Sequence, residues 1–427
     1  MVYPSLSHKE AYINLAVIGL GKLGLPLAVL LASNGNRVKG FDNSQVVRDL
    51  VRSKTLKSSE PGLIELINSP SISLNVVENI KEAVEGSEII FIIVPTPSLP
   101  SGHFSNEYVI DAVNNVGKHI GSSQRVVIDI VSTVMPGSCE GPIKSALELS
   151  SRKLVGHEVG LCYNPEFIAL GSVLHDMEMP DMHLIGQSSP WAGEIVERAL
   201  QSIVKKIVPS RRMSLTEAEL VKIAVNNFVT MKISFANSLL QASVRLTEID
   251  IDVVTEALGL DTRIGNKYLK AAAPYGGPCF PRDTRALAAL YQDLGISDSL
   301  SEATETVNKS HVDFIVNFIC KQIKKGEKVG ILGLSYKAGT SVKDESPGVL
   351  IARGLSELGF QILAWDQEII AEGINEIDKH YKLCETSSEV IRDANFVVIS
   401  RVLANNSIVK KQLLNSHRPF YDIWRQF

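Results

Sequence analysis

The 427-residue sequence has few cysteines, no long apolar run and little net charge, and each of these features argues against a class of protein. Its five cysteines form no C-x-x-C pair, which argues against a disulfide framework and for a reducing compartment. No run approaches the ~20 apolar residues of a membrane span, and residues 1–11 contain no apolar signal core. The net charge of −4 implies no general nucleic-acid surface. We therefore expect a cytoplasmic protein that has no membrane or nucleic-acid partner.

The chain does have the length and composition of a globular protein with two or three domains. It is 45% hydrophobic and 21% charged, which is ordinary for such proteins. Short apolar runs alternate with helical stretches in the first half, a pattern typical of a parallel, doubly wound α/β sheet. The strands that we predict there are residues 13–18, 37–41, 88–94, 126–131, 159–163 and 182–185.

A glycine-rich turn follows the first predicted strand. The stretch Gly19-Leu20-Gly21-Lys22-Leu23-Gly24 lies between this strand and an apolar helix, and Asp42 ends the next strand. This context is typical of a dinucleotide site, in which the glycines admit the pyrophosphate and the acid binds the ribose hydroxyls. A carboxylate repels a 2′-phosphate, so we expect NAD rather than NADP. The residues predicted to bind it here are Gly19, Gly21, Lys22, Leu23, Gly24 and Asp42.

Three further strand ends carry polar or proline-rich turns. They are Pro95-Thr96-Pro97, Ser132-Thr133 and Asn164-Pro165-Glu166. Ligands of open α/β sheets bind beyond the carboxyl ends of the strands, so these turns are candidates to line the nicotinamide. Simple turn chemistry is the alternative explanation.

The stretch from Tyr275 to Asp283 (YGGPCFPRD) carries the strongest chemical signal. Cys279 follows two glycines, which let the backbone approach a ligand closely. Arg282 adds positive charge, and a cysteine in such a setting can act as a thiolate nucleophile. Together with a nicotinamide cofactor, this cysteine suggests an oxidation through a covalent intermediate.

Residues 215–258 contain long stretches of helical apolar spacing, and Ser214 with Glu217 forms a capping box at the start. We predict one long helix, or a helix pair broken near residues 249–250, that also offers a dimerisation surface. Lys222 and Asn226 are four residues apart and share one face. On this pattern the two side chains are either snorkelling or functional.

Residues 328–332 (KVGIL) open a second α/β unit that lacks the dinucleotide fingerprint. Its further predicted strands are residues 360–365, 396–399 and 420–423, and the loop 333–337 is its candidate nucleotide loop. The predicted fold is two Rossmann-like doubly wound domains joined by a long central helix. The predicted boundaries are 1–212 for the NAD-binding domain, 213–306 for the helical dimerisation domain, and 307–427 for the second Rossmann-like domain.

Seven motifs in one order give the chain a resemblance to the UDP-sugar 6-dehydrogenases, of which UDP-glucose dehydrogenase is the type. The motifs are Gly19-x-Gly-x-x-Gly24, Ser132-Thr133-Val134, Asn164-Pro-Glu-Phe167, Glu219-Leu-Val-Lys222 with Asn226, Arg263-Ile-Gly-Asn-Lys-Tyr268, Gly276-Gly-Pro-Cys279 with Asp283, and Gly333-Leu-Ser-Tyr-Lys337.

The resemblance implies a homodimer and a four-electron oxidation of the sugar C6 alcohol by NAD. Cys279 matches the cysteine that forms a thiohemiacetal and then a thioester, and Lys222 matches the lysine that stabilises the oxyanion. Asn226 matches an orienting residue, Asp283 the acid near the cysteine, and Thr133 with Glu166 the pair that handles the hydrolytic water. From the polar turns, Pro95, Thr96 and Thr133 are expected to contact NAD, and Lys343 is expected to substitute for a family arginine that meets NAD phosphate.

The same resemblance implies a UDP-sugar site. Arg263 matches an arginine that reaches the partner subunit's sugar site, so the dimer is expected to be needed for activity. The expected substrate-binding residues are Glu166, Phe167, Lys222, Asn226, Arg263, Tyr268, Lys270, Tyr275, Gly276, Gly277, Tyr336, Lys337 and Arg425.

Two positions depart from the family pattern. Leu170 stands where UDP-glucose enzymes usually carry a second glutamate, and Asp344 stands where an arginine usually meets NAD phosphate, with Lys343 beside it. UDP-glucose is the first-choice substrate. The alternatives are a UDP-N-acetylhexosamine dehydrogenase, a two-electron hydroxyacid-type dehydrogenase that has no use for Cys279, and a catalytically lapsed UDP-sugar-binding protein.

A last cluster imitates a metal site. His175, Asp176, Glu178, Asp181 and His183 lie within nine residues. They lack metalloprotease spacing and precede a strand, so we interpret the segment as a solvated loop and expect no metal.

Overall fold

The computed structural model describes residues 12–58, 60–70, 72–297, 299–373, 378–403 and 406–427. The prediction about a signal core in residues 1–11 lies outside this part of the chain. The chain forms two compact units, residues 1–222 and 223–427. Among the described residues, no helix is both long enough and apolar enough to cross a membrane.

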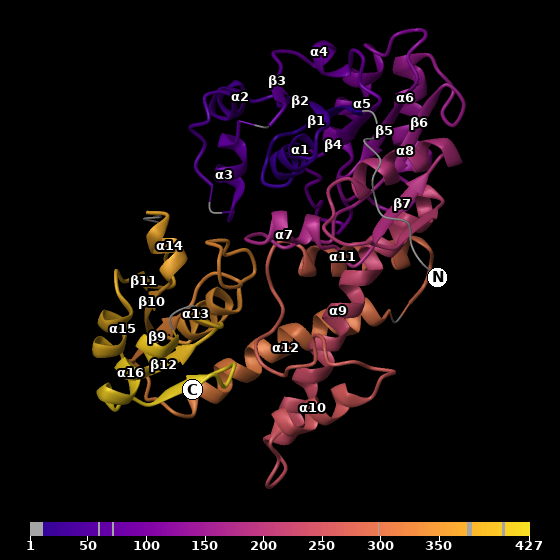
Figure 1. Cartoon of the computed structure of the whole chain (residues 1–427). Coiled ribbons are helices and arrows are strands. Elements are labelled where there is room, and N and C mark those ends of the chain that lie inside the picture. Colours follow the sequence, from indigo (N-terminus) through magenta and orange to yellow (C-terminus); the bar gives the residue numbers. More distant parts are fainter. Residues whose placement is uncertain (1–11, 59, 71, 298, 374–377, 404–405) are drawn as a thin grey trace, which may run out of the picture. The chain divides into compact units, whose positions relative to one another are not determined.

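The first unit contains an eight-stranded sheet in the order β3-β2-β1-β4-β5-β6-β7-β8 (Figure 1). Five of the six strands predicted for it are parallel to their neighbours from β2 to β6, the arrangement expected of a doubly wound fold. The strands are β1 (Asn14–Ile18), β2 (Arg37–Phe41), β3 (Leu74–Val76), β4 (Ile89–Ile92), β5 (Val126–Ile130), β6 (Val159–Tyr163), β7 (His183–Gln187) and β8 (Ser210–Met213).

Helices cover both faces of this sheet because its central strands are apolar on both sides. Leu15 and Val17 of β1 pack with α1, α3, α7 and α8, whereas Ala16 and Ile18 pack with α4, α5 and the segment η1–α6. These helices are α1 (Gly24–Ser33), α2 (Gln45–Arg52), α3 (Leu63–Asn68), α4 (Ile80–Val84), α5 (Glu107–Gly117), η1 (Cys139–Ile143), α6 (Lys144–Ser151), α7 (Val173–Glu178) and α8 (Pro190–Gln201).

Two predictions about the segment after β6 are wrong. First, β7 runs antiparallel to β6. A parallel return needs a crossover along the length of the strand, and the six residues of α7 span only about 9 Å against about 17 Å for a five-residue strand. Second, the cluster from His175 to His183 is not a solvated loop. His175 lies in α7, and His183 is buried in β7.

The central helix is interrupted, as one of the two predicted alternatives requires. Helix α9 (Leu215–Ser243) has 29 residues, and α10 (Ile251–Leu260) follows it. The predicted capping box is present, since Ser214 N donates to Glu217 Oε2 at 2.8 Å and Glu217 N donates to Ser214 Oγ at 3.3 Å. Asp250 starts α10 by accepting a hydrogen bond from Asp252 N at 2.9 Å.

The second unit contains a five-stranded parallel sheet in the order β11-β10-β9-β12-β13 (Figure 1). Its strands are β9 (Lys328–Leu332), β10 (Gln361–Trp365), β11 (Lys382–Leu383), β12 (Phe396–Ile399) and β13 (Phe420–Asp422). The helices of this unit after α10 are α11 (Phe280–Asp293), α12 (Leu300–Cys320), α13 (Pro347–Glu357), α14 (Gln367–Ala371), α15 (Ser387–Asp393) and α16 (Asn406–Ser416).

In each unit, the start of a helix passes very close to the turn that follows the first strand of the sheet. A Cβ on Gly24 would lie 1.9 Å from the carbonyl oxygen of Gly19, and a Cβ on Gly348 would lie 2.0 Å from that of Gly333. Gly19 and Gly333 have φ values of +97° and +107°, a region that L-residues rarely adopt. Each unit therefore needs glycine both where its first strand ends and where the next helix begins.

An aspartate at the end of the second strand of each sheet binds this turn. Asp42 accepts from Leu20 N at 2.8 Å, and Asp366 accepts from Leu334 N at 2.7 Å. In the second unit, the guanidinium of Arg401 also binds Asp366, at 3.1 and 3.2 Å. Both side chains are buried, and the charge of Arg401 contributes to holding the pKa of Asp366 at about 2.

We predict that Arg401→Ala lowers the free energy of unfolding of the second unit by about 3–5 kcal/mol, because a buried carboxylate loses its partner. Urea denaturation measures this change. The matched control is Arg392→Ala, which removes an exposed pair with Asp393 and should cost less than about 1 kcal/mol. Equal losses in the two variants would contradict the prediction. The contribution of Asp366 is present above pH 3.8 and is lost as the pH falls toward 2.

Candidate active site

The predicted NAD residues of the first unit gather at one edge of its sheet. The last residues of four parallel strands, Ile18, Ile92, Ile130 and Tyr163, lie in one row of the register. The glycine turn and the three predicted polar turns follow these residues, so all four begin at the same edge. This edge is where ligands of open α/β sheets bind.

The glycine turn has the shape that a dinucleotide needs. Nothing lies within 4 Å of a Cβ built on Gly21, so this residue faces open space at the start of α1. Asp42 accepts from two backbone N–H groups, Leu20 N and Ser44 N, each at 2.8 Å. Its carboxylate is thereby fixed beside the turn while lone pairs remain for ribose hydroxyls. The residues present therefore fit NAD.

The neighbouring turns are fixed to each other by side chains. Ser132 Oγ accepts from Val94 N and donates to Val94 O, both at 2.8 Å, which ties the turn of Thr96 to that of Thr133. Beyond Thr133, the buried carboxylate of Glu219 accepts from Gly137 N at 2.6 Å and from Cys139 N at 2.7 Å. Sequence reasoning used Glu219 only as part of a motif and missed this anchoring contact.

Glu166, Phe167 and Lys222, three of the expected substrate-binding residues, meet in the first unit. The ammonium of Lys222 donates to the main-chain carbonyl of Glu166 at 2.5 Å and lies 4.5 Å from the centroid of the Phe167 ring. Lys222 is buried, so the contact fixes a cation beside the turn after β6. A buried ammonium in this place can stabilise a developing oxyanion.

Glu166 is half-buried, and desolvation of its carboxyl raises its pKa to about 7, although the charge of Lys222 acts in the opposite direction. The group can therefore give and take a proton near neutral pH. Leu170, which replaces the second family glutamate, packs partly buried against the apolar cluster around α1 and α7. It cannot take part in proton transfer.

Cys279 begins α11 in the second unit and is exposed. The N-terminus of a helix favours negative charge, which suits a thiolate at this position. Asp283, one turn later, is buried and accepts from Asn226 Nδ2 at 2.6 Å. Asn227 Nδ2 also donates to the carbonyl of Asp283, at 2.9 Å. The amides of α9 thus fix the start of the helix that carries the cysteine.

Tyr336 packs on the cysteine turn. A Cβ on Gly277 would lie 2.5 Å from the Tyr336 ring, and Gly277 has a φ of +85°. Burial raises the pKa of Tyr336 to about 12, and the nearby charge of Cys279 adds to the effect. The structure therefore brings together Tyr336, Gly277 and Cys279, three of the predicted substrate and catalytic residues.

Lys270 and Arg425 share one carboxylate that sequence reasoning missed. Arg425 Nε and Nη2 bind Asp252 of α10 at 2.8 and 2.7 Å, and Lys270 Nζ lies 3.7 Å from the same carboxylate. Arg425 Nη2 also donates to the carbonyl of Ala271. In the sequence, Asp252 is recognisable only as an acidic residue in the first turn of a helix, and this gives no indication of its contact with Arg425.

Of the remaining predicted residues of this unit, Tyr268 and Lys337 lie near the cysteine turn, since the Tyr268 ring meets that of Phe280 edge-on with 6.4 Å between the centroids. Arg263 is exposed and binds Asp261 through Nε at 2.9 Å and Nη2 at 2.6 Å. Tyr268 is exposed, with a φ of +64°. The ammonium of Lys337 lies 5.9 Å from the Tyr336 ring centroid, and that of Lys343 lies 3.4 Å from Tyr381 Oη.

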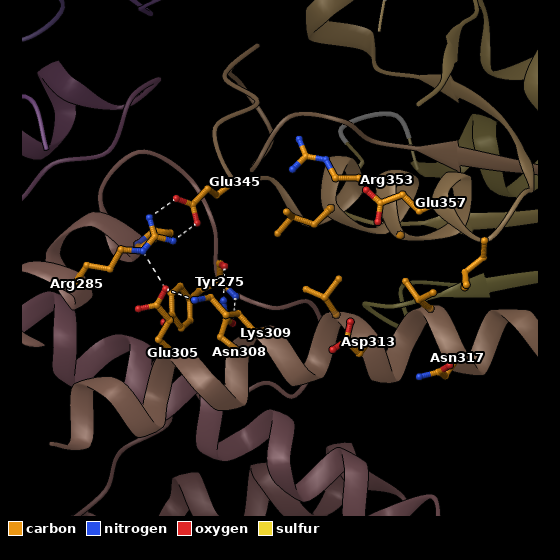
Figure 2. Close-up of a pocket in the computed structure, with 16 residues that line it drawn as sticks. Tyr275, Arg285, Glu305, Asn308, Lys309, Asp313, Asn317, Glu345, Arg353 and Glu357 are labelled. Carbon is orange, nitrogen blue, oxygen red and sulfur yellow. Dashed lines mark hydrogen bonds and ion pairs between the residues drawn. The ribbon is translucent and has the colours of Figure 1, made fainter. Parts of the chain in front are cut away.

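A cavity of about 610 Å³ lies between α11, α12 and α13 of the second unit. Figure 2 shows Arg285 between Glu345 and Glu305, with Tyr275 of the cysteine turn at the same end and Arg353 with Glu357 on α13 at the other. Cys279 does not line this cavity. We therefore take the cysteine turn, and not the cavity, as the candidate site of the reaction. Among the described residues, no group of three or more His, Cys, Asp or Glu could hold a metal ion.

Three domain profiles of one family match most of the chain. They are described as the NAD binding domain, the central domain and the UDP binding domain of the UDP-glucose/GDP-mannose dehydrogenase family. The matched residues are 13–204, 216–310 and 330–425.

Several known proteins are similar over most of their length. UDP-glucose 6-dehydrogenase TuaD of Bacillus subtilis is 32% identical over 84% of this chain and 77% of its own. GDP-mannose 6-dehydrogenase of Pseudomonas aeruginosa is 28% identical over 94% and 93%. The solved UDP-glucose dehydrogenase of Pyrobaculum islandicum is 32% identical, with a TM-score of 0.86 over 95% and 93% of the two chains.

We predict that Gly21→Ala weakens NAD binding at least about tenfold, because the new methyl group enters the open space over the glycine turn. The melting temperature should hold, since nothing in the protein lies within 4 Å of that methyl group. Calorimetric titration with NAD measures the affinity. Gly121→Ala, which changes an exposed glycine away from the turn, is the control and should bind NAD as the wild type does. Unchanged affinity in Gly21→Ala would contradict this placement of NAD.

Proposed function

Because the chain belongs to the UDP-glucose/GDP-mannose dehydrogenase family, whose members are NAD-dependent nucleotide-sugar 6-dehydrogenases, we propose that its substrate is UDP-glucose and its product the UDP-uronic acid. The observation that carries the proposal is an exposed cysteine at the head of α11, packed against Tyr336 and followed by a buried Asp283 that binds Asn226. A cysteine is needed when an aldehyde must be oxidised again without being released.

In the proposed reaction, the C6 alcohol loses a proton and a hydride and becomes an aldehyde. When bound, NAD would supply the hydride acceptor, and two NAD molecules are needed in turn, one for each oxidation. The thiolate of Cys279 adds to the aldehyde carbon, and a proton on the resulting oxygen completes a thiohemiacetal. Loss of that proton and a second hydride gives a thioester. Water then attacks the carbonyl carbon, the C–S bond breaks, and the carboxylic acid and the thiolate are released.

Lys222 and Asn226, one turn apart on α9, are the proposed donors to the oxygen that gains charge in these steps. Asp283 fixes Asn226 through the 2.6 Å hydrogen bond. Thr133 and Glu166 are the proposed water-handling pair. With a pKa of about 7, Glu166 can act as the base for water near neutral pH. Since Leu170 offers no second carboxylate, we assign this role to Glu166 alone.

UDP-glucose is supported over the alternatives by similarity. TuaD and the Pyrobaculum islandicum enzyme, both at 32% identity, are named for UDP-glucose, whereas relatives at 28% include both UDP-glucose and GDP-mannose 6-dehydrogenases. The profile over residues 330–425 is that of a UDP-binding domain, which supports a uridine nucleotide. The proposed contacts to it include Tyr336 and Lys337 of the second sheet, together with Lys270 and Arg425.

We further propose that the protein acts as a homodimer with Arg263 reaching the partner's sugar site. Support comes from apolar side chains that α9 and α10 leave exposed, among them Phe228, Phe235, Val253 and Leu260. Phe228 and Phe235 are seven residues apart and share a helix face. The proposed domain boundaries remain 1–212, 213–306 and 307–427.

We predict that the wild type forms two NADH per uronate when it is mixed with NAD and UDP-glucose, because both oxidations occur on one enzyme. Cys279→Ser should lower the rate of uronate formation at least about 1,000-fold, as expected for loss of a nucleophile. Absorbance at the NADH band and chromatography of the sugar nucleotide give the ratio.

Other sugar nucleotides decide between the alternatives in the same assay. Turnover of a UDP-N-acetylhexosamine or of GDP-mannose in place of UDP-glucose would replace the proposed substrate. Binding of UDP-sugars without any NADH would indicate a lapsed enzyme. Unchanged activity in Cys279→Ser would indicate a two-electron dehydrogenase, which needs no cysteine nucleophile.

We predict that the rate of thioester hydrolysis rises with pH through about 7, because the Glu166 carboxyl loses its proton there. Glu166→Gln should lower this rate about 100-fold or more and remove the rising limb. Rapid-quench measurement of the covalent intermediate from pH 5.5 to about 9 tests this. A rising limb that persists in Glu166→Gln would assign the base to another group.

A further inference from the structure

The loop between β9 and α13, residues 333–346, carries three residues of the proposed site: Tyr336, Lys337 and Lys343. It lies directly on the cysteine turn. Gly277 N donates to the carbonyl of Asp344 at 2.9 Å, and a Cβ on Gly276 would lie 2.1 Å from the carbonyl of Glu345. The position of this loop therefore decides which groups face the cysteine.

Glu345, near the end of the loop, has a strained backbone. Its φ is +43°, in the left-handed region that residues other than glycine, asparagine and aspartate rarely adopt. Such a conformation persists only when the surrounding structure fixes it. The side chain of Glu345 supplies one such constraint by accepting from Arg285.

Arg285 binds Glu345 with both ends of its guanidinium. Its Nη1 and Nη2 each lie 2.6 Å from a carboxylate oxygen of Glu345, and its Nε lies 2.9 Å from Glu305 Oε1 (Figure 2). Lys309 Nζ also lies 2.9 Å from Glu305. Arg285 stands on α11, six residues after the cysteine that begins this helix, so one guanidinium connects the helix of Cys279 with the loop and with α12.

The base of the cysteine turn is fixed to α12 as well. Asn308 Oδ1 accepts from Tyr275 N at 2.8 Å, and Asn308 Nδ2 donates to Tyr275 O at 3.0 Å. The turn, α11 and α12 thus form one frame. Arg285 and Glu345 form an ion pair that joins the loop to this frame, beside the packing of Tyr336 on Gly277.

The solvent exposure of the Arg285–Glu345 pair favours a role in positioning the loop over a role in stabilising the fold. The side chains of Arg285 and Glu345 are 39% and 43% exposed, and ion pairs as exposed as this add little to stability. A bidentate pair nevertheless fixes direction as well as distance. Its loss should leave the fold intact and loosen the loop.

We propose that Arg285 is a positioning residue of the reaction, which holds the loop of Tyr336 and Lys337 against the Cys279 turn through its bidentate pair with Glu345. This inference rests on the proposed function, because it gives the loop a part in binding the substrate. Neither Arg285 nor Glu345 touches the reacting atoms in this proposal. Their effect reaches the chemistry through the loop.

The test compares Arg285→Gln, Glu345→Gln and the double variant in full-length protein. Each single variant should lower kcat/KM for UDP-glucose about tenfold, since small misplacements near reacting atoms are costly. The double variant should be no worse than either single one, because both changes remove one interaction. Arg285→Lys keeps the charge without the fork and should recover part of the loss. Arg353→Gln, in the same cavity, is the control and should retain wild-type kinetics.

A second measurement does not depend on turnover. Hydrogen exchange of peptides covering residues 333–346 should be at least about fivefold faster in Arg285→Gln than in the wild type or in Arg353→Gln. Unchanged exchange overturns the proposal whatever the activity. Faster exchange with unchanged kcat/KM, or additive losses in the double variant, also overturns it. If the wild type itself oxidises no sugar nucleotide, the proposed function fails, while the exchange measurement still decides whether the pair holds the loop.

Discussion

The close approach of a helix start to the end of the first strand is the constraint on which both units depend. At Gly19 and Gly24, and again at Gly348, a Cβ would lie about 2 Å from a carbonyl oxygen, and a Cβ on Gly333 would lie 2.5 Å from Arg401 Cγ. Because the backbones pass so closely, the following helix points its N-terminus at the carboxyl edge of the sheet. The polar turns lie next to one another only because the strands that they follow end in one row.

Each unit has such a turn, but the two turns differ in what surrounds the aspartate, because the guanidinium of Arg401 is present only in the second unit. In the first unit, Asp42 is partly exposed beside an open glycine turn, so it can receive ribose hydroxyls. In the second unit, Arg401 and Ser335 occupy the oxygens of Asp366. A ribose has no free acceptor there, which agrees with the absence of a dinucleotide fingerprint from the second sheet. The loop 333–346 is left to meet the cysteine turn instead.

Local patterns predicted most of the elements because each depends on neighbouring residues. The strands β2, β9 and β12 have the predicted bounds, and Asp250 breaks the central helix where an acid can cap a new one. The short strands β3 (LNV), β8 (SRRM) and β11 (KL) were missed because each contains polar residues and is only partly buried, so none forms an apolar run. The direction of β7 was wrong because strand orientation is set by the path of the connection, which apolar spacing does not encode.

The sequence by itself determined the chemistry that the protein carries. The glycine turn with Asp42, the cysteine motif around Cys279 and the family resemblance follow from residue types at fixed spacings, which is why they could be identified without coordinates. Only the tertiary structure decided the partners. Asp252 joins Arg425 across 173 residues, and Glu345 joins Arg285 across 60. Nothing in the local sequence selects one carboxylate among many for a given arginine, because that choice depends on which segments the packed core brings within hydrogen-bonding distance.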